Sequence, residues 1–423
     1  LMDRAGYGVA LAAVRMGAGY GSRIAVLAGR GNNGGDAYVA ARYLHERGAD
    51  VTVHALGFPK GEHSPARKGA AAASLAGVRM VDLDAPSDAD IVIDGLFGTG
   101  FHGTLPDDVV GWTATDAPVL AIDVPSGLDG LHGTTDGPAF TATRTVTFDA
   151  RKVGHLVGEG PERCGIVEVH RIGLPDPEPE FWICDDADAP VTARRRDDHK
   201  WSVGSVAVVG GSAGLVGAAV MAASSALEFG AGAVRLITPG GLRSEAAAGQ
   251  PGLMTEGIGS GDAFVPDEVG RILDAVGRFD VLVLGPGIGK GRSVVVEQIL
   301  ARWDRPLVLD ADGINGASLD VLERRTAPTI ITPHAGEFER LTGEPASHVA
   351  AFALADQTGS VVVLKGSPTF VVGSERWAIT SGGPELATIG SGDVLAGMIG
   401  ALVARGMPLE VAARSAAHRH GLA

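Results

Sequence analysis

Short runs of β-branched residues alternate with helix-like runs in two separate parts of the chain. The first alternation lies between residues 23 and 170, and the second begins near residue 206 and continues to the end. This alternation predicts βαβ units, in which parallel strands form a sheet that helices cover on both faces. Because 423 residues are too many for one ordinary core, we expect two α/β domains.

The sequence between the two alternations is typical of a linker. It is rich in proline and acidic residues from Leu174 onward, and it is rich in Arg and Asp up to His199. We therefore place the domains at residues 1–180 and 190–423, the first as a Rossmann-like parallel-sheet sandwich. The predicted strands are 24–28, 51–55, 91–93, 119–122, 145–148, 206–209, 233–238, 281–284, 307–309, 329–331 and 361–364, with helices at 36–48, 64–77 and 394–405.

Composition excludes several classes of function. A formal net charge of −15 argues against nucleic acid as a partner, and the basic cluster at 194–196 is followed at once by two aspartates. No apolar run reaches the roughly 18 residues of a membrane span. Two cysteines suit a reducing cytoplasm. The chain begins on Leu1 rather than Met, so we expect further residues upstream.

The loop after the first predicted strand is rich in glycine. Gly29, Gly31 and Gly34 match the dinucleotide-binding pattern between a strand and a helix. The acid that should hold a ribose is missing, because the second strand ends on His54-Ala-Leu. An ordinary Rossmann dehydrogenase is therefore disfavoured, and Asn32 and Asn33 indicate a loop that offers amides to a polar ligand or a cation.

Two more loops leave strands at the same predicted sheet edge. Asp94 follows residues 91–93, and Asp123 and Ser126 follow residues 119–122. Since the carboxyl ends of parallel strands open on one crevice, these loops should converge. Asn33, Asp94 and Ser126 would then offer hard oxygen donors that suit K⁺ or Mg²⁺. The alternative is that each loop is only glycine-dense turn material.

A glycine turn near the C-terminus begins a predicted helix. Gly390 and Gly392 bracket the turn, and Asp393 stands at the helix start, where free N–H groups favour an anion. A base beside an anion hole is what phosphoryl transfer to a hydroxyl requires. Lys365, at the end of another predicted strand, would add a cation. The alternative is a plain turn with an aspartate cap.

The first loop set resembles the NAD(P)HX epimerase family over about residues 1–175. The matching motifs are Asn32-Asn-Gly-Gly-Asp36, Asp94-x-x-x-Gly-Thr-Gly100 and Asp123-x-Pro-Ser-Gly127, while Ala37 stands where the family has Gly. The resemblance implies a K⁺ site at Asn33, Asp94 and Ser126 and a catalytic Asp123, either as a base or as a residue that orients the hydrate. It implies substrate binding by Asn32, Asn33, Gly34, Gly35, Asp36, Gly98, Thr99, Gly100, Phe101, His102, Gly103 and Thr104.

The second loop set resembles the ribokinase-like superfamily, and specifically ADP-dependent NAD(P)HX dehydratase, over about residues 190–423. The matching motifs are residues 310–315, 332–337 and 390–397, with Ser391 where the family has Thr. The resemblance implies that Asp393 takes the proton of the hydrate hydroxyl. It implies nucleotide binding by Lys365, Gly366, Ser367, Pro368, Thr369 and Gly392, and hydrate binding by Ala218, Gly287, His334 and Asp393. His334 could instead be a satisfied core histidine.

Together the resemblances imply a bifunctional NAD(P)HX repair enzyme. Such an enzyme epimerises R- and S-NAD(P)HX and dehydrates the S epimer to NAD(P)H, with ADP as co-substrate giving AMP and phosphate, and with Mg²⁺. We expect a cytoplasmic homo-oligomer without a nucleic-acid or membrane partner. Two alternatives are a small-molecule kinase of the hydroxymethylpyrimidine or hydroxyethylthiazole type, and an N-terminal domain that binds without catalysing.

Overall fold

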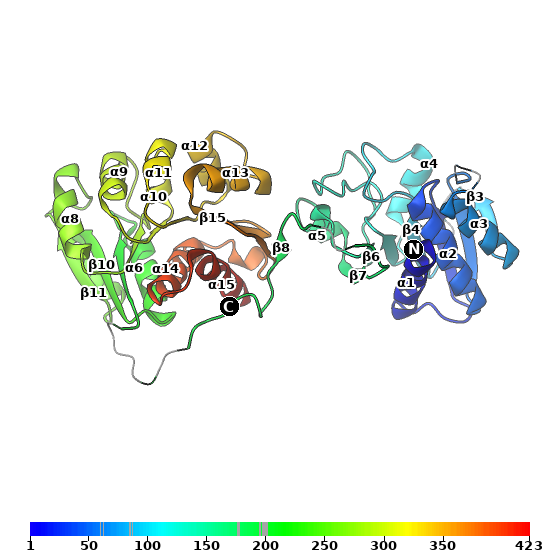
Figure 1. The fold of residues 1–423 in the computed structure, drawn as a ribbon, viewed down its shortest axis with the longest axis horizontal. Helices are drawn as coiled ribbons and strands as arrows, with labels where there is room; N and C mark the ends of the chain where they lie inside the picture. Colours follow the sequence, from blue (N-terminus) through cyan, green and yellow to red (C-terminus); the bar gives the residue numbers. More distant parts are fainter. Residues whose placement is uncertain are drawn as a thin grey trace. The chain divides into compact units, whose positions relative to one another are not determined.

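The computed structural model describes residues 1–59, 61, 63–83, 86, 88–175, 178–193, 196 and 202–423. It divides into two compact units, Leu1–Glu178 and Pro179–Ala423 (Figure 1). Most of the basic cluster predicted as linker, Arg194 and Arg195, lies outside the described residues, as do the two aspartates that follow it. No helix in the described part of the chain is long and apolar enough to cross a membrane.

Within its described residues, the first unit contains seven strands and five α-helices. The strands are β1 (Arg23–Ala28), β2 (Asp50–Ala55), β3 (Arg79–Asp82), β4 (Ile91–Gly95), β5 (Val119–Ile122), β6 (Arg144–Phe148) and β7 (Ile166–His170). The helices are α1 (Met2–Arg15), α2 (Asn32–Glu46), α3 (Pro65–Leu75), α4 (Asp107–Val110) and α5 (Gly160–Arg163), with 3-10 turns η1 (Gly111–Ala114) and η2 (Val153–His155).

The seven strands form one parallel sheet in the order β3-β2-β1-β4-β5-β6-β7. Alternate residues of each strand face opposite sides. Ile24 and Val26 pack with α1, α2 and α3 on one face, whereas Ala25 and Leu27 pack with Trp112 of η1 on the other. The predicted parallel sheet covered on both faces is thereby confirmed. Helix α2 begins at Asn32, one turn before the predicted start at Asp36.

The described part of the second unit contains ten strands and ten α-helices. The strands are β8 (Trp182–Ile183), β9 (Ser205–Val209), β10 (Ala233–Pro239), β11 (Met254–Ile258), β12 (Val281–Leu284), β13 (Leu307–Leu309), β14 (Thr329–Ile331), β15 (Val361–Leu364), β16 (Thr369–Val372) and β17 (Arg376–Ile379). The helices are α6 (Val216–Glu228), α7 (Arg243–Gly249), α8 (Val269–Val276), α9 (Ser293–Arg302), α10 (Asp312–Asn315), α11 (Leu319–Arg324), α12 (Ala335–Thr342), α13 (His348–Thr358), α14 (Ser391–Ala404) and α15 (Leu409–Leu422), with 3-10 turns η3 (Gly240–Leu242), η4 (Pro266–Glu268) and η5 (Pro384–Leu386).

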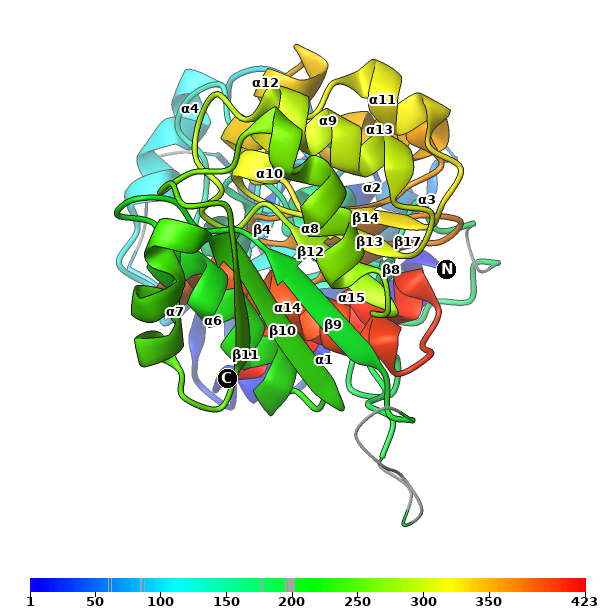
Figure 2. The same cartoon turned by 90° about the vertical axis from the view of Figure 1, so that its left-hand side faces the viewer.

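The ten strands form one sheet in the order β11-β10-β9-β12-β13-β14-β15-β16-β17-β8, and Figure 2 shows β11, β10 and β9 side by side. Pairing is parallel from β11 to β15, and β16 then pairs antiparallel with both β15 and β17. Residues of α6, α14 and α15 cover one face of the sheet, and residues of α8, α9, α10 and α11 cover the other. The parallel core places β13, β14 and β15 next to one another, so their carboxyl ends share one edge.

The segment predicted as a linker contains ordered structure of the second unit. Strand β8 pairs in parallel with β17, and Cys184 and Ala189 are buried in the core beside α15. The domain boundaries drawn from composition therefore differ from this division, because a short apolar segment packs within otherwise polar sequence. The second unit begins at Pro179 rather than near residue 190.

Candidate functional sites

The carboxyl ends of β1, β4 and β5 border a cavity of about 1120 Å³ in the first unit. The cavity forms because α2 begins immediately after the β1 loop and two further loops follow β4 and β5. Nine of the residues predicted to form the N-terminal site line it: Asn32, Asn33, Asp36, Gly98, Thr99, Gly100, Phe101, His102 and Asp123. The three loops thus converge as expected from a parallel sheet.

Asp123 has a strained backbone and many partners. Its φ is +67°, in the left-handed region that non-glycine residues rarely occupy. Thr99 N donates to its carboxylate at 3.1 Å, Thr147 Oγ1 donates at 3.0 Å, and Lys152 Nζ lies 3.0 Å away. Burial raises the pKa of Asp123, but Lys152 and these hydrogen bonds outweigh it and lower the pKa overall. Asp123 is therefore held as an anion that faces the cavity.

Asp36 is the second carboxylate of this cavity, and its environment is the opposite. Burial in the first turns of α2, together with the negative charge of Asp123, raises its pKa to about 7. Near neutral pH, one wall of the cavity therefore presents an ionised carboxylate and a carboxyl group that is partly protonated. Paired carboxyls with separated pKa values are typical of sites that move protons.

Asp94 and Ser126 lie together beneath the cavity. The Ser126 N–H donates to Asp94 at 2.7 Å, and the Ser126 hydroxyl donates to it at 2.6 Å. Burial raises the pKa of Asp94 to about 6, and no charged group among the described residues opposes this effect. Asn33 reaches the same place, since its amide donates to the Phe97 carbonyl at 2.8 Å, which Ser126 also contacts. The structure thus gathers the three predicted cation ligands.

Four residues predicted to bind substrate do not line the cavity. Gly34 and Gly35 are buried inside α2, where a Cβ on Gly34 would collide with the Gly29 carbonyl and a Cβ on Gly35 would collide with Met2. These glycines permit close packing, so the motif also serves to dock the helix. Gly103 and Thr104 are exposed at the far end of their loop.

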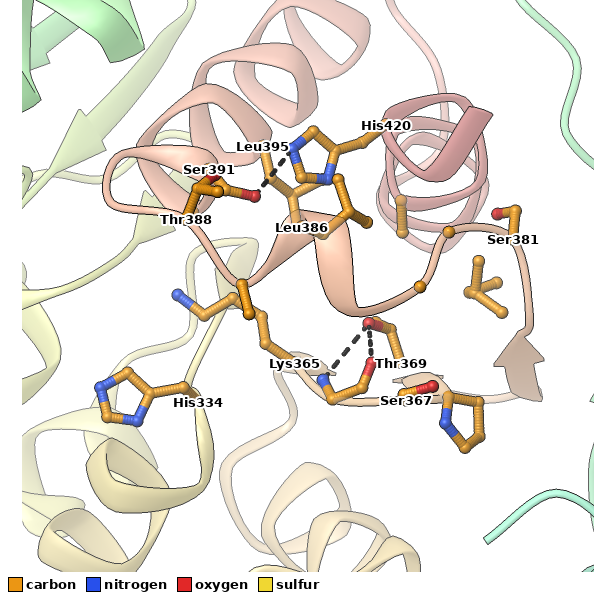
Figure 3. A pocket seen from close by; sticks show the side chains of 18 of the residues that line it. His334, Lys365, Ser367, Thr369, Ser381, Leu386, Thr388, Ser391, Leu395 and His420 are labelled. Atoms are coloured by element: carbon orange, nitrogen blue, oxygen red, sulfur yellow. Dashed lines mark hydrogen bonds between the residues drawn. The ribbon is translucent and has the colours of Figure 1, made fainter. Parts of the chain in front are cut away.

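A cavity of about 590 Å³ in the second unit lies where β13 and β15 end and α14 begins (Figure 3). Eight of the residues predicted for the C-terminal site line it: His334, Lys365, Gly366, Ser367, Pro368, Thr369, Gly392 and Asp393. Ala218 and Gly287 do not line it. They lie beside each other elsewhere, because a Cβ built on Gly287 would stand 3.2 Å from the Ala218 Cβ.

The start of α14 provides an anion-binding geometry. Gly390 precedes the helix with a φ of +92°, which a side chain would strain. A Cβ on Gly392 would stand 3.1 Å from Lys365 Nζ, so the missing side chain leaves open the space between the ammonium and the first helical turn. Free N–H groups at a helix start favour an anion there.

Lys365 is already paired in the structure. Its ammonium donates to Asp310 Oδ1 at 2.8 Å and lies 3.7 Å from Glu337 Oε2. Thr332 Oγ1 also donates to Asp310, at 2.7 Å. Burial lowers the pKa of Lys365, but Asp310 and Glu337 outweigh it and raise the pKa overall, so the ammonium stays charged.

Asp393 lies in the first turn of α14, next to this ion-pair network. Burial, together with the negative charges of Asp310 and Glu337, raises its pKa to about 7, although Lys365 opposes them. A carboxylate with a pKa near neutral is suited to accept a proton from a hydroxyl at working pH.

His334 caps helix α12 and faces solvent with 54% of its side chain exposed. Its Nδ1 accepts the N–H groups of Gly336 at 3.0 Å and Glu337 at 3.3 Å. The alternative of a buried core histidine is therefore wrong. With Nδ1 as acceptor, the ring proton is on Nε2, which lies 3.4 Å from Glu337 Oε1.

Comparison with known proteins covers both units. The family described as NAD(P)H-hydrate dehydratase matches residues 206–423, and the family described as YjeF-related protein N-terminus matches residues 1–154. A bifunctional NAD(P)H-hydrate repair enzyme of Salinibacter ruber is 36% identical, with 100% of this chain and 86% of the relative covered. One from Moorella thermoacetica is 34% identical, with 95% of this chain and 82% of the relative covered.

The chain belongs to the family of bifunctional NAD(P)H-hydrate repair enzymes. A solved structure supports the fold of its second unit. A ribokinase-like superfamily protein from Enterococcus faecalis is 26% identical with a TM-score of 0.51, and the match covers 57% of this chain and 86% of that one. The expected ribokinase-like fold is thereby confirmed. The alternative of a hydroxymethylpyrimidine-type kinase is not favoured, since relatives of the repair-enzyme family match along almost the whole chain.

Several polar residues of these repair-enzyme sites were not singled out from the sequence. Asp310 and Glu337 belong to the motifs at 310–315 and 332–337. Each motif follows a predicted strand, and this position could have indicated that both residues lie at the site. Lys152 lies within residues 1–154, which match the family described as YjeF-related protein N-terminus. His420 carried no signal, because it lies on the last helix and reaches the cavity only through folding, with Nε2 3.2 Å from Ser391 Oγ.

Proposed function

We propose that this protein repairs hydrated nicotinamide nucleotides in two steps, one at each site. The first unit interconverts the R and S epimers of NADHX and NADPHX. The second unit dehydrates the S epimer to NADH or NADPH and converts ADP to AMP and phosphate. The observation that carries the proposal is Asp393, a carboxylate with a pKa of about 7 that stands between a helix start and the Lys365 network.

Dehydration begins at the hydroxyl on C6 of the hydrated ring. Asp393 accepts the hydroxyl proton as the oxygen attacks the β-phosphorus of ADP, and AMP leaves. Gly392 N–H and the start of α14 stabilise the charge of the transferring group, and Lys365 lies on its other side. Residues Gly366–Thr369, which line the cavity next to Lys365, hold the nucleotide.

The phosphate ester then leaves, which hydroxide could not do readily. The lone pair of the ring nitrogen expels phosphate from C6, and loss of a proton from the neighbouring ring carbon restores the double bond. Ala218, Gly287 and His334 would hold the hydrate. The exposed imidazole of His334 supports this role, because it lines the cavity that contains Asp393.

Epimerisation at the first site requires inversion at C6. Asp123 accepts the hydroxyl proton, the bond between C6 and the ring nitrogen breaks to give an aldehyde, and the nitrogen receives the proton. Closure from the other face of the aldehyde gives the other epimer. The lowered pKa of Asp123 and the raised pKa of Asp36 support a pair that shuttles this proton. The remaining residues that line the cavity position the nucleotide.

Asn33, Asp94 and Ser126 fit a monovalent cation. Asp94 is a fully buried carboxylate that accepts hydrogen bonds and has no charged partner among the described residues, and its raised pKa reflects this. When bound, K⁺ would supply the positive charge that keeps Asp94 ionised. Mg²⁺ would arrive on the nucleotide phosphates.

The direct test supplies mixed NADHX epimers and ADP to the purified protein and follows the absorbance of the reduced cofactor. The proposal requires that absorbance return fully and that AMP and phosphate form in equal amounts. A stable phosphorylated product would instead indicate a kinase. Homo-oligomeric assembly in the cytoplasm, without nucleic-acid or membrane partners, stays a prediction.

A further inference from the structure

A third cavity, of about 430 Å³, lies in the second unit between the loop after β12 and helices α10 and α12. Three cationic side chains line it, Lys290, Arg292 and Arg340, together with one carboxylate, Asp312. This concentration of positive charge stands out in a chain with a formal net charge of −15. No residue that lines this cavity also lines the cavity of Asp393.

The three cations of the cavity are only partly offset by its single carboxylate, Asp312. Arg340 Nε donates to the Asn315 amide oxygen at 2.8 Å, and Arg292 Nη1 donates to the Phe264 carbonyl at 3.2 Å. Arg292 Nε is buried without a hydrogen-bond partner. Asp312 is bonded instead to the Asn315 amide, at 3.0 Å. Within the described ranges, no carboxylate forms an ion pair with any of the three cations, in contrast to Lys365, which has two acidic neighbours.

The cavity adjoins residues that we assign to the hydrate. Its wall begins at Gly289, two residues beyond Gly287. On the other side, a Cβ built on Gly336 would stand 3.3 Å from Arg340 Nη1 and 3.1 Å from His334 Cε1, so the guanidinium and the imidazole flank the same glycine. If His334 and Gly287 hold one part of a ligand, the groups that extend from that part would therefore reach the cationic cavity.

The hydrate is a dinucleotide, so negatively charged phosphates extend from its ring. We propose that Lys290, Arg292 and Arg340 form a subsite for a phosphate of this hydrate. The inference rests on the function proposed above. Unpaired Arg and Lys side chains are the groups that bind phosphate most strongly. The phosphates of ADP are needed at Asp393 instead, where the transferred group must lie. The phosphate is either the pyrophosphate shared by both substrates or the 2′-phosphate of NADPHX.

The test compares Lys290→Gln and Arg340→Gln with a matched control, Arg324→Gln, which removes an exposed cation that is 73% accessible on α11. The full chain is assayed for dehydration of S-NADHX and S-NADPHX at saturating ADP. We expect KM to rise about tenfold in each subsite variant, with kcat within about twofold of wild type, because a phosphate contact is lost in binding rather than in the chemical step. A rise in KM for both substrates would show that the subsite binds the pyrophosphate. A rise in KM for S-NADPHX alone would show that it binds the 2′-phosphate.

Unchanged KM in both variants, or an equal rise in Arg324→Gln, would overturn the inference while leaving the dehydratase intact. Calorimetric titration with NADPH and NADH provides a second measurement that does not depend on turnover. If the wild type failed to dehydrate the hydrate, the proposed function would be wrong, and weaker NADPH binding by Lys290→Gln would still support the subsite. Binding of inorganic phosphate alone, with dinucleotide affinity unchanged in the variants, would contradict it.

Discussion

Lys365 Nζ lies 2.8 Å from Asp310 Oδ1, so the cation that follows β15 is held by a carboxylate that follows β13. The pair places a charged ammonium beside the open space at Gly392. It also places the negative charge of Asp310 near Asp393, whose pKa it raises. One ion pair therefore both positions the cation for the proposed phosphate binding and tunes the proposed base.

Replacing the proposed base tests its role in the chemical step. Asp393→Asn should lower the rate of dehydration by about 10²–10⁴, the usual loss for a general base, and leave ADP affinity within a few-fold. Single-turnover kinetics and calorimetry measure the two quantities separately. Dehydration above about a tenth of the wild-type rate would remove Asp393 from this role.

The pH dependence of dehydration should follow the ionisation of Asp393. The residue accepts a proton only as a carboxylate, and burial together with Asp310 raises its pKa to about 7. The value of kcat/KM should therefore fall as pH decreases below 7 and level off above it. Asp310→Asn removes a negative charge next to Asp393, which should lower the pKa of Asp393 and shift the fall in kcat/KM to lower pH. A flat profile from about pH 5 to about pH 8 would exclude Asp393 as the titrating base.

Removal of the Lys365 ammonium should affect both binding and stability. Lys365→Ala should weaken ADP binding by about 1.5–3 kcal/mol, the contribution of a hydrogen bond to a charged group. It should also lower the free energy of unfolding by about 3 kcal/mol, because Asp310 is left buried without its partner. The double variant Lys365→Ala with Asp310→Ala should recover the stability but not the affinity. Unchanged ADP affinity in either variant would place the phosphates elsewhere.

Potassium should influence only the first site. Exchange of K⁺ for Li⁺ should slow epimerisation, since Asp94 would lose the cation that keeps it ionised, and dehydration of pure S epimer should not change. Asp94→Asn should slow epimerisation in either salt. Equal epimerisation rates of the wild type in K⁺ and Li⁺ would argue against a cation at Asn33, Asp94 and Ser126.

The sequence predicted the parts of the structure that follow from chain-local patterns. Buried parallel strands such as Val119–Ile122 appear as apolar runs, and residues at their ends, such as Asp123 and Lys365, must lie at one sheet edge. Contacts between residues that lie far apart in the chain leave no such pattern in the sequence. The bond between Ser391 and His420 depends on the packing of α15, and strand β8 pairs with β17, which lies far along the chain.

The role of the glycines in the motif at residues 32–36 could not be predicted from the sequence either. A glycine in a ligand loop and a glycine that admits a neighbouring backbone look identical in sequence, and only the structure shows that Gly34 faces the Gly29 carbonyl. Likewise, the sequence supplies Lys290 and Arg340 fifty residues apart, and folding brings both to one cavity.

The two-site assignment is tested most directly by the time course of mixed epimers with Asp123→Ala. Wild type should convert all of the hydrate, because the first site resupplies the S epimer. The variant should consume the S fraction at the wild-type rate and then stall, since its Asp393 site is unchanged and Asp123 lies in the other unit. If the variant consumed both epimers faster than they interconvert spontaneously, epimerisation would not depend on Asp123 and the N-terminal assignment would be contradicted.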